Sequence, residues 1–212
     1  ISRFEEWHYQ EGKTDEHGRM DARQQFLVKN HLYRKPVVDH LVLCFLKALG
    51  IEVQNQKTRY RITHDVDFIV RKNNLFHVIK SMAGAILKRQ NFQSALLIWQ
   101  NRKAGNPYDT FNWMLRKEGE IEKAIYFLVG GQSVFDNSYD LQLPVFKKAT
   151  QLSKERGYKI GIHPSYESWK DQRLFSGELE RLQKAIGEEI NLTRQHFLRF
   201  SFKETPQIIQ RL

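Results

Sequence analysis

The feature that most constrains the fold is an alternation of short apolar, strand-like stretches with helix-like stretches, which starts at residue 59. Each strand pattern is followed by a helix pattern, and such a sequence folds as right-handed β-α-β units around a parallel sheet. We expect an α/β domain over residues 58–212 that forms a partial or distorted parallel (β/α) barrel, with the fold continuing beyond residue 212. Its four strands are expected near residues 60–66, 123–129, 158–163 and 192–199.

Residues 1–57 have a different pattern and are expected to form a mostly helical N-terminal segment. Its strongest element is an amphipathic helix that begins near Pro36 and ends at Gly50, with apolar residues at three- and four-residue steps. The single cysteine, Cys44, lies in the apolar run "LVLCFLKAL" of this helix. We expect Cys44 to be a core residue without a disulfide or a metal, because an unpaired cysteine behaves as a small hydrophobic residue.

The composition excludes several classes of protein. A hydrophobic content of 41% can build a sizeable core, so a disordered chain is excluded. The net charge of +10 suggests attraction to polyanions, but lysine and arginine are spread along the chain without a run of five like charges, and no nucleic-acid-binding signature is present. We therefore expect no specific nucleic-acid partner, and the sequence does not indicate an oligomeric state.

Targeting signals are not visible in the sequence. No apolar run approaches the roughly 20 residues that a bilayer span needs. The segment after Ile1 has no basic region followed by an apolar one, as a signal peptide would have. With a single cysteine, these features favour a cytoplasmic location, provided that no segment precedes Ile1.

Ionisable residues gather where the predicted strands end, which is where parallel α/β folds place their sites. Asp65 and Asp67 share one face of the first strand, whereas His64 points to the opposite face. In such a pair, one carboxylate can bind a metal while the other acts as a base towards a water. Later strand ends carry His163 and His196.

Two imidazoles and one carboxylate form a ligand set suited to zinc or another divalent transition metal. Arg194 shares a strand face with His196 and is placed to hold the second aspartate ionised by a charge-assisted hydrogen bond. Taken singly, each of these residues also fits a structural role: a D-x-D pair is common, a histidine can bond to the backbone of a core, and an arginine can form a surface ion pair.

The motifs "THDVD", "GIHPSYES" and "RQHFLRF" together resemble those of the polysaccharide deacetylase superfamily, the family-four carbohydrate esterases. The resemblance covers about residues 58–212 and is greatest to bacterial deacetylase-like proteins with an N-terminal accessory region, of which residues 1–57 would be the end. By this resemblance, Asp65 is the catalytic base and Asp67 is a metal ligand.

Two motifs depart from the family pattern. The family's H-S/T-x-x-H motif supplies two histidine ligands, and here it starts with His163 but has Glu167 in place of the second histidine. The family's R-x-P-Y motif starts with Arg194 and has His196 at the proline position. The resemblance therefore implies an exchange in which His196 is the third ligand. Glu167, Tyr166 and His64 stay open as an alternative ligand or as substrate contacts.

The resemblance implies a metal-dependent hydrolase that removes acetyl groups from an N-acetylated or O-acetylated sugar or polysaccharide. Zinc is the expected metal, with cobalt, nickel and manganese as alternatives, a carbohydrate is the expected partner, and the general acid is expected beyond residue 212. Two other interpretations stay open: a catalytically silent module of the same fold that binds polyanions or glycans or acts as a scaffold, and a nucleotide-sugar glycosyltransferase that uses the D-x-D pair.

Overall fold

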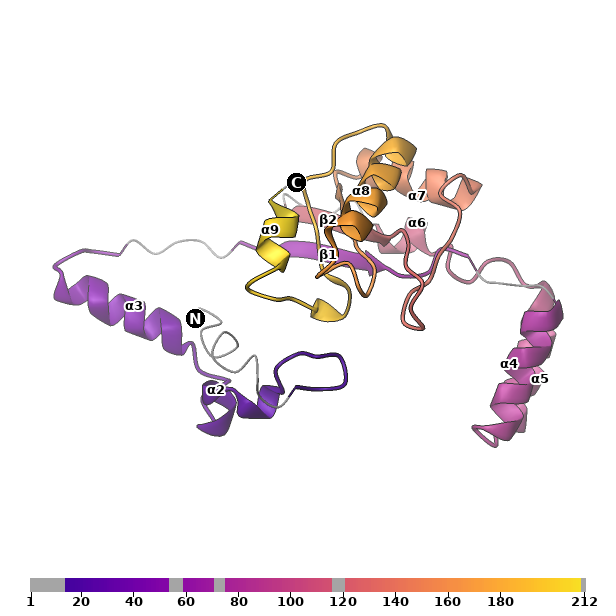
Figure 1. Cartoon of the computed structure of the whole chain (residues 1–212), viewed down its shortest axis with the longest axis horizontal. Coiled ribbons are helices and arrows are strands. Elements are labelled where there is room, and N and C mark those ends of the chain that lie inside the picture. Colours follow the sequence, from indigo (N-terminus) through magenta and orange to yellow (C-terminus); the bar gives the residue numbers. More distant parts are fainter. Residues whose placement is uncertain (1–13, 54–58, 71–74, 116–120, 211–212) are drawn as a thin grey trace.

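The computed structural model describes residues 14–53, 59–70, 75–115 and 121–210, and its centre is a three-stranded parallel sheet (Figure 1). The strands lie in the order β1-β2-β3, and each pair is parallel. Their bounds are β1 (Arg61–Val66), β2 (Glu122–Leu128) and β3 (Lys159–His163). The predicted α/β class and three of the four predicted strands are thus confirmed, whereas closure into a barrel stays an expectation.

The central strand β2 is covered on both faces, and it is apolar after Lys123. All of its residues after Glu122 are buried, as is typical of a strand inside a parallel sheet. On one face, Phe127 meets Phe146 of α7 (Pro144–Glu155) edge to face, with 5.3 Å between the ring centroids. This contact lies in the core between the sheet and the helices.

On the opposite face of the sheet, Tyr126 of β2 leaves no room for a side chain at Gly161 of β3. A Cβ atom on Gly161 would lie 2.5 Å from the ring of Tyr126 and 2.9 Å from the carbonyl oxygen of Leu192. Only a residue without a side chain permits this approach. The segment around Leu192 can therefore lie directly against β3.

Helix α8 (Gln172–Ile186) follows the loop after β3 and has a clear local signal at each end (Figure 1). The side chain of Asp171 accepts hydrogen bonds from the backbone N–H groups of Arg173 and Leu174, which caps the first turn. Gly187 follows the helix with a left-handed φ of 76°, which glycine adopts without strain. These signals fix the residues at which the helix begins and ends.

The prediction of a fourth strand over residues 192–199 is wrong, because this segment pairs with the sheet at one residue only. Thr193 forms one parallel bridge with Ile162 of β3. The chain then leaves the sheet and forms the short 3-10 helix η3 (His196–Leu198). Thus the segment lies beside β3 in the expected place, but it contributes a single bridge in place of a strand.

The side chain of His196 explains this departure. Its two ring nitrogens contact the ring of His163 and the carbonyl oxygen of Phe135, so the residue turns towards the end of the sheet. Phe197 and Leu198 consequently take left-handed φ values of 55° and 56°. Such values are costly for residues with large side chains.

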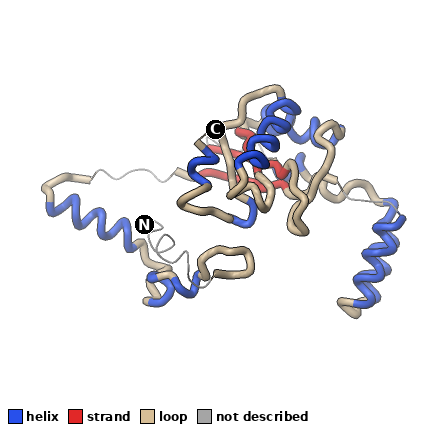
Figure 2. The backbone as a smooth tube through the Cα atoms, in the orientation of Figure 1, coloured by secondary structure: helices blue, strands red, loops and turns tan. Residues whose placement is uncertain are grey.

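The remaining helices are short or lie away from the sheet. Helices α4 and α5 form a pair that projects from the rest of the molecule (Figures 1 and 2). Helix α6 has a single turn within the described residues, and residues 116–120 lie outside them. The bounds are η1 (Ala22–Gln24), α2 (Phe26–Lys29), α3 (Val37–Ala48), α4 (Leu75–Leu87), α5 (Phe92–Gln100), η2 (Asn101–Lys103), α6 (Phe111–Met114) and α9 (Thr205–Ile209).

None of the helices in the described residues combines the length and the apolar character that a bilayer span requires. The division into segments 1–57 and 58–212 stays a prediction.

The prediction that Cys44 is a core residue is wrong. Helix α3 forms where it was expected, but none of its residues is buried, and Cys44 is exposed. The apolar periodicity correctly predicted the helix. It could not predict burial, because in the described part of the chain no other element covers this helix.

Because Cys44 is exposed, the native protein should react with a chromogenic thiol reagent at about the rate of the urea-unfolded protein, within about tenfold. One thiol per chain should be labelled, and Cys44→Ser should abolish the reaction. Labelling that occurs only after unfolding would show that the side chain is covered.

Candidate metal centre

Asp67, His163 and His196 meet at the C-terminal edge of the sheet, although they are far apart in the sequence. One ligand atom from each lies within 4.8 Å of the others. His163 Nε2 is 2.9 Å from His196 Nδ1 and 3.5 Å from Asp67 Oδ1, and His196 Nδ1 is 3.9 Å from that carboxylate oxygen. Both histidines are buried and Asp67 is half-buried. This triad could hold a metal ion.

Each member comes from a different part of the fold. Asp67 directly follows the end of β1, His163 is the last residue of β3, and His196 begins η3. Strands β1 and β3 flank β2, so their C-terminal ends lie at the same edge of the sheet. The turn at η3 brings the third member to this edge.

The outer nitrogen of each imidazole is held by a backbone carbonyl. His163 Nδ1 lies 2.5 Å from the carbonyl oxygen of Arg194, and His196 Nε2 lies 3.0 Å from that of Phe135. A carbonyl oxygen only accepts hydrogen bonds, so both outer nitrogens donate and carry a proton. In neutral imidazoles, the two inner nitrogens then present lone pairs to each other across 2.9 Å.

Two facing lone pairs repel unless something positive lies between or beside them. Burial lowers the pKa of His163 below the ordinary histidine value, so this ring favours its neutral form. Asp67 Oδ1 is also buried and has no hydrogen-bond partner among the described residues. Three electron-pair donors thus converge without a donor hydrogen to satisfy them, and a divalent cation fits this arrangement.

Asp65 lies beside the triad without belonging to it. Arg194 Nη1 donates to Asp65 Oδ1 at 3.2 Å, and Nη2 donates to the hydroxyl of Thr63 at 2.8 Å. The guanidinium also lies over the ring of Tyr126, 4.8 Å from its centroid. These contacts fix the arginine on the strand that precedes the metal ligand, and they place a positive charge next to Asp65.

Glu167, the alternative third ligand, lies outside the triad. Its carboxylate pairs with Arg199 and with Lys170, each at 3.0 Å. Both carboxylate oxygens are thus directed to cations, and Arg199 Nη1 also donates to the carbonyl of Tyr166. Among the described residues, the donor set consists of Asp67, His163 and His196.

The two other candidate contacts differ in their positions. The hydroxyl of Tyr166 lies 3.0 Å from His17 Nδ1, so this side chain supports the loop after β3. His64 projects from the opposite face of β1, where its ring lies 5.8 Å from that of Tyr158. The structure therefore brings Tyr166 near the site and leaves His64 on the far side of the strand.

A hairpin near the N-terminus reaches the site, and the sequence patterns did not predict it. Thr14 and Met20 form an antiparallel bridge, and the turn between them buries His17 against the rings of Phe135, Tyr166 and Phe197. Arg19 Nη1 donates to the carbonyl oxygen of Phe197 at 2.8 Å, directly beside His196. The available signal was the turn sequence "DEHGR", in which the Asp15 carboxylate accepts from two backbone N–H groups of the turn.

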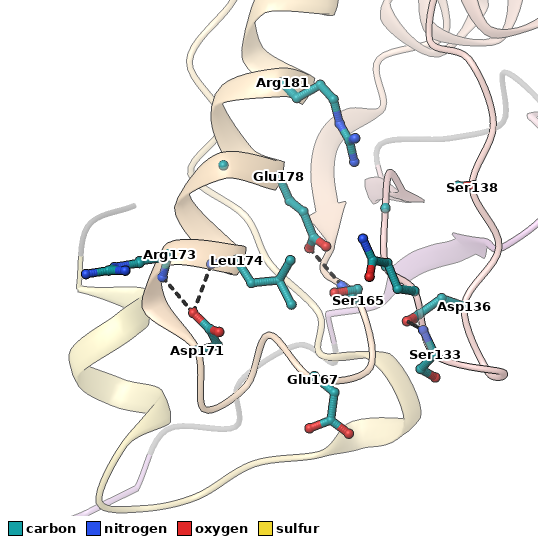
Figure 3. A pocket seen from close by; sticks show the side chains of 14 residues that line it. Ser133, Asp136, Ser138, Ser165, Glu167, Asp171, Arg173, Leu174, Glu178 and Arg181 are labelled. Carbon is teal, nitrogen blue, oxygen red and sulfur yellow. Dashed lines mark hydrogen bonds between the residues drawn. The ribbon is translucent and has the colours of Figure 1, made fainter.

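A cavity of about 710 Å³ lies between the loops after β2 and β3 and helix α8 (Figure 3). Among the described residues, its lining includes no member of the triad. Glu178 points from α8 towards Ser165 and accepts a hydrogen bond from its backbone N–H at 2.9 Å. Arg181 donates to the carbonyl oxygen of Val129 on the same side.

No protein-family model, curated protein or solved structure matches this chain. The assignment of chemistry therefore depends on the site itself.

Burial raises the pKa of Glu178, so the folded state favours the protonated acid. A raised carboxyl pKa contributes stability below the unfolded value and loses it as the pH rises through the folded value. Glu178→Gln, which keeps an acceptor for Ser165, should therefore raise the free energy of unfolding at about pH 7 and have a smaller effect at about pH 5.

Urea denaturation of both proteins at the two pH values measures this difference. Exposed Glu180, on the same helix, gives the control Glu180→Gln, which should change stability by less than about 0.5 kcal/mol. Equal destabilisation by Glu178→Gln at both pH values would contradict the argument.

Proposed function

We propose that this chain carries the catalytic centre of a metal-dependent deacetylase of the polysaccharide deacetylase type. It would remove acetyl groups from N-acetylated or O-acetylated sugars. The observation that supports this most is the convergence of two proton-free imidazole nitrogens and an unpartnered carboxylate oxygen, with a second, arginine-bound aspartate beside them. A carbohydrate substrate and a cytoplasmic location belong to the proposal.

The two histidines and Asp67 would hold the metal. An N,N,O donor set favours zinc, and cobalt, nickel and manganese are the alternatives. When bound, a divalent ion supplies a Lewis acid that lowers the pKa of water and polarises an acyl carbonyl. The carbonyl groups of Arg194 and Phe135 orient the two rings towards this ion.

Asp65 would serve as the general base. Its oxygens are directed to Arg194, whose Nη1 lies 3.2 Å from Oδ1, and to solvent instead of to the triad. Asp65 would accept the proton of the water that attacks the acetyl carbonyl. Arg194 would keep this carboxylate in position as its charge changes.

Metal binding tests the triad directly. Zinc titration of the metal-free chain by calorimetry should show one site, and alanine at Asp67, His163 or His196 should weaken it by more than about 100-fold, since even loss of an outer partner costs 10- to 100-fold. Glu167→Ala is the matched control and should keep wild-type affinity. Loss of zinc in Glu167→Ala alone would assign the third ligand to the glutamate.

A wild-type chain that binds no divalent metal at micromolar concentrations would favour the binding or scaffold module over the enzyme.

Catalysis tests the role of Asp65. Asp65→Asn should keep zinc but lower acetate release from N-acetylated and O-acetylated oligosaccharides by about 10²- to 10⁴-fold, the usual cost of losing a general base. Asp39→Asn, on the exposed helix α3, controls for the change of charge. Unchanged acetate release by Asp65→Asn would exclude this residue as the base.

A further inference from the structure

The α4–α5 pair carries an unusual distribution of charge. Between Asp67 and Asp109 the sequence has no acidic residue. The same stretch contains seven basic residues: Arg71, Lys72, Lys80, Lys88, Arg89, Arg102 and Lys103. A long segment with only positive charge is attracted to polyanionic surfaces.

The same segment exposes an unusual amount of apolar surface. Among the described residues of α4 and α5, those that are buried are Val78, Ala85 and Ala95. The pair stands away from the sheet and its covering helices (Figures 1 and 2). Its exposed large apolar side chains are Leu75, Phe76, Ile79, Leu87, Phe92, Leu96, Leu97 and Trp99.

Apolar and basic side chains lie close together in the sequence at the turn between the two helices. Leu87 is 79% exposed and Phe92 is 71% exposed, and exposed Lys88 and Arg89 lie between them in the sequence. Between α4 and α5, a groove of about 340 Å³ is lined by Lys88 and Arg89 together with Ser81 and Ser94. Cationic and hydroxyl groups of this kind bind phosphate.

A cation also marks the far end of α5. The guanidinium of Arg102 lies over the ring of Trp99, 3.8 Å from its centroid, and donates to the carbonyl oxygen of that residue at 2.8 Å. Tryptophan with a neighbouring arginine is typical of side chains at the boundary between water and lipid, since each has an apolar body and a polar end.

These observations favour a lipid surface over other partners. Two copies of this hairpin would bring like charges together without an acidic residue to neutralise them, which disfavours self-association. Nucleic acid would use the cations but leave Leu87 and Phe92 in water. An anionic bilayer accommodates both groups, because its headgroups attract lysine and arginine and its acyl region accepts apolar side chains.

We propose that the α4–α5 hairpin binds the surface of an anionic bilayer, with Leu87 and Phe92 inserted and Lys88 and Arg89 at the phosphate level. The binding is peripheral. It does not depend on the metal centre or on the proposed deacetylation, so each can fail without the other.

Co-sedimentation of the full chain with vesicles tests this proposal. The protein should bind vesicles made of equal parts of phosphatidylcholine and phosphatidylglycerol, bind pure phosphatidylcholine weakly, and dissociate from the anionic vesicles as salt is added. Lys88→Ala/Arg89→Ala should weaken partitioning about 30-fold, since each basic residue near such a surface contributes about 1 kcal/mol.

Lys147→Ala/Lys184→Ala is the matched control, because it removes two exposed lysines from α7 and α8, and it should bind the vesicles like wild type. Leu87→Ser/Phe92→Ser should weaken binding without changing the net charge or the stability, since both side chains are exposed. Equal loss in the control pair would reduce the effect to net charge and overturn the proposal.

Two other results would also overturn it. One is a lack of binding to anionic vesicles at low salt. The other is a dimer in solution, without lipid, that Leu87→Ser/Phe92→Ser dissociates, because the apolar tip would then be an interface between two copies of the chain.

Discussion

The arrangement of the candidate metal centre depends on two hydrogen bonds from histidine rings to backbone carbonyls. His163 donates to the carbonyl of Arg194, and His196 donates to that of Phe135. Each bond fixes the tautomer of its ring and turns the remaining lone pair inward. The first bond connects β3 to the segment beside it, and the second connects that segment to the loop after β2, so the bonds position the loops as well as the ligands.

The backbone directly after His196 adopts a strained conformation in this arrangement. Phe197 and Leu198 are both left-handed, which is unfavourable for large side chains, and the surrounding contacts must offset that cost. The N-terminal hairpin supplies two of them: Arg19 Nη1 donates to the carbonyl oxygen of Phe197, and His17 packs against the ring of Phe197. The hairpin therefore supports the turn that carries the third ligand, although it belongs to the segment expected to be an accessory region.

The candidate metal centre and the α4–α5 hairpin are built on different principles. Around the triad, buried polar atoms are directed by backbone groups and a neighbouring arginine, so the chemistry depends on precise positions. The α4–α5 hairpin exposes many large apolar and basic side chains, and its attraction to a surface depends on area and charge. In these proposals, the metal centre would perform the reaction and the α4–α5 hairpin would bind the protein to a membrane surface.

The sequence by itself determined the strands β1, β2 and β3, because strand patterns that alternate with helix patterns fold as parallel β-α-β units. It also determined that Asp67 and His163 lie at one edge, since parallel strands end together. It did not determine the path after Thr193, where the side chain of His196 turns the backbone out of the sheet. Nor did it determine that Cys44 is exposed, because periodicity specifies a helix and only a neighbouring element can cover it. The contact of His17 with the site could not be predicted for the same reason. Its partner Tyr166 lies 149 residues away in the sequence, and only tertiary structure brings the two side chains together.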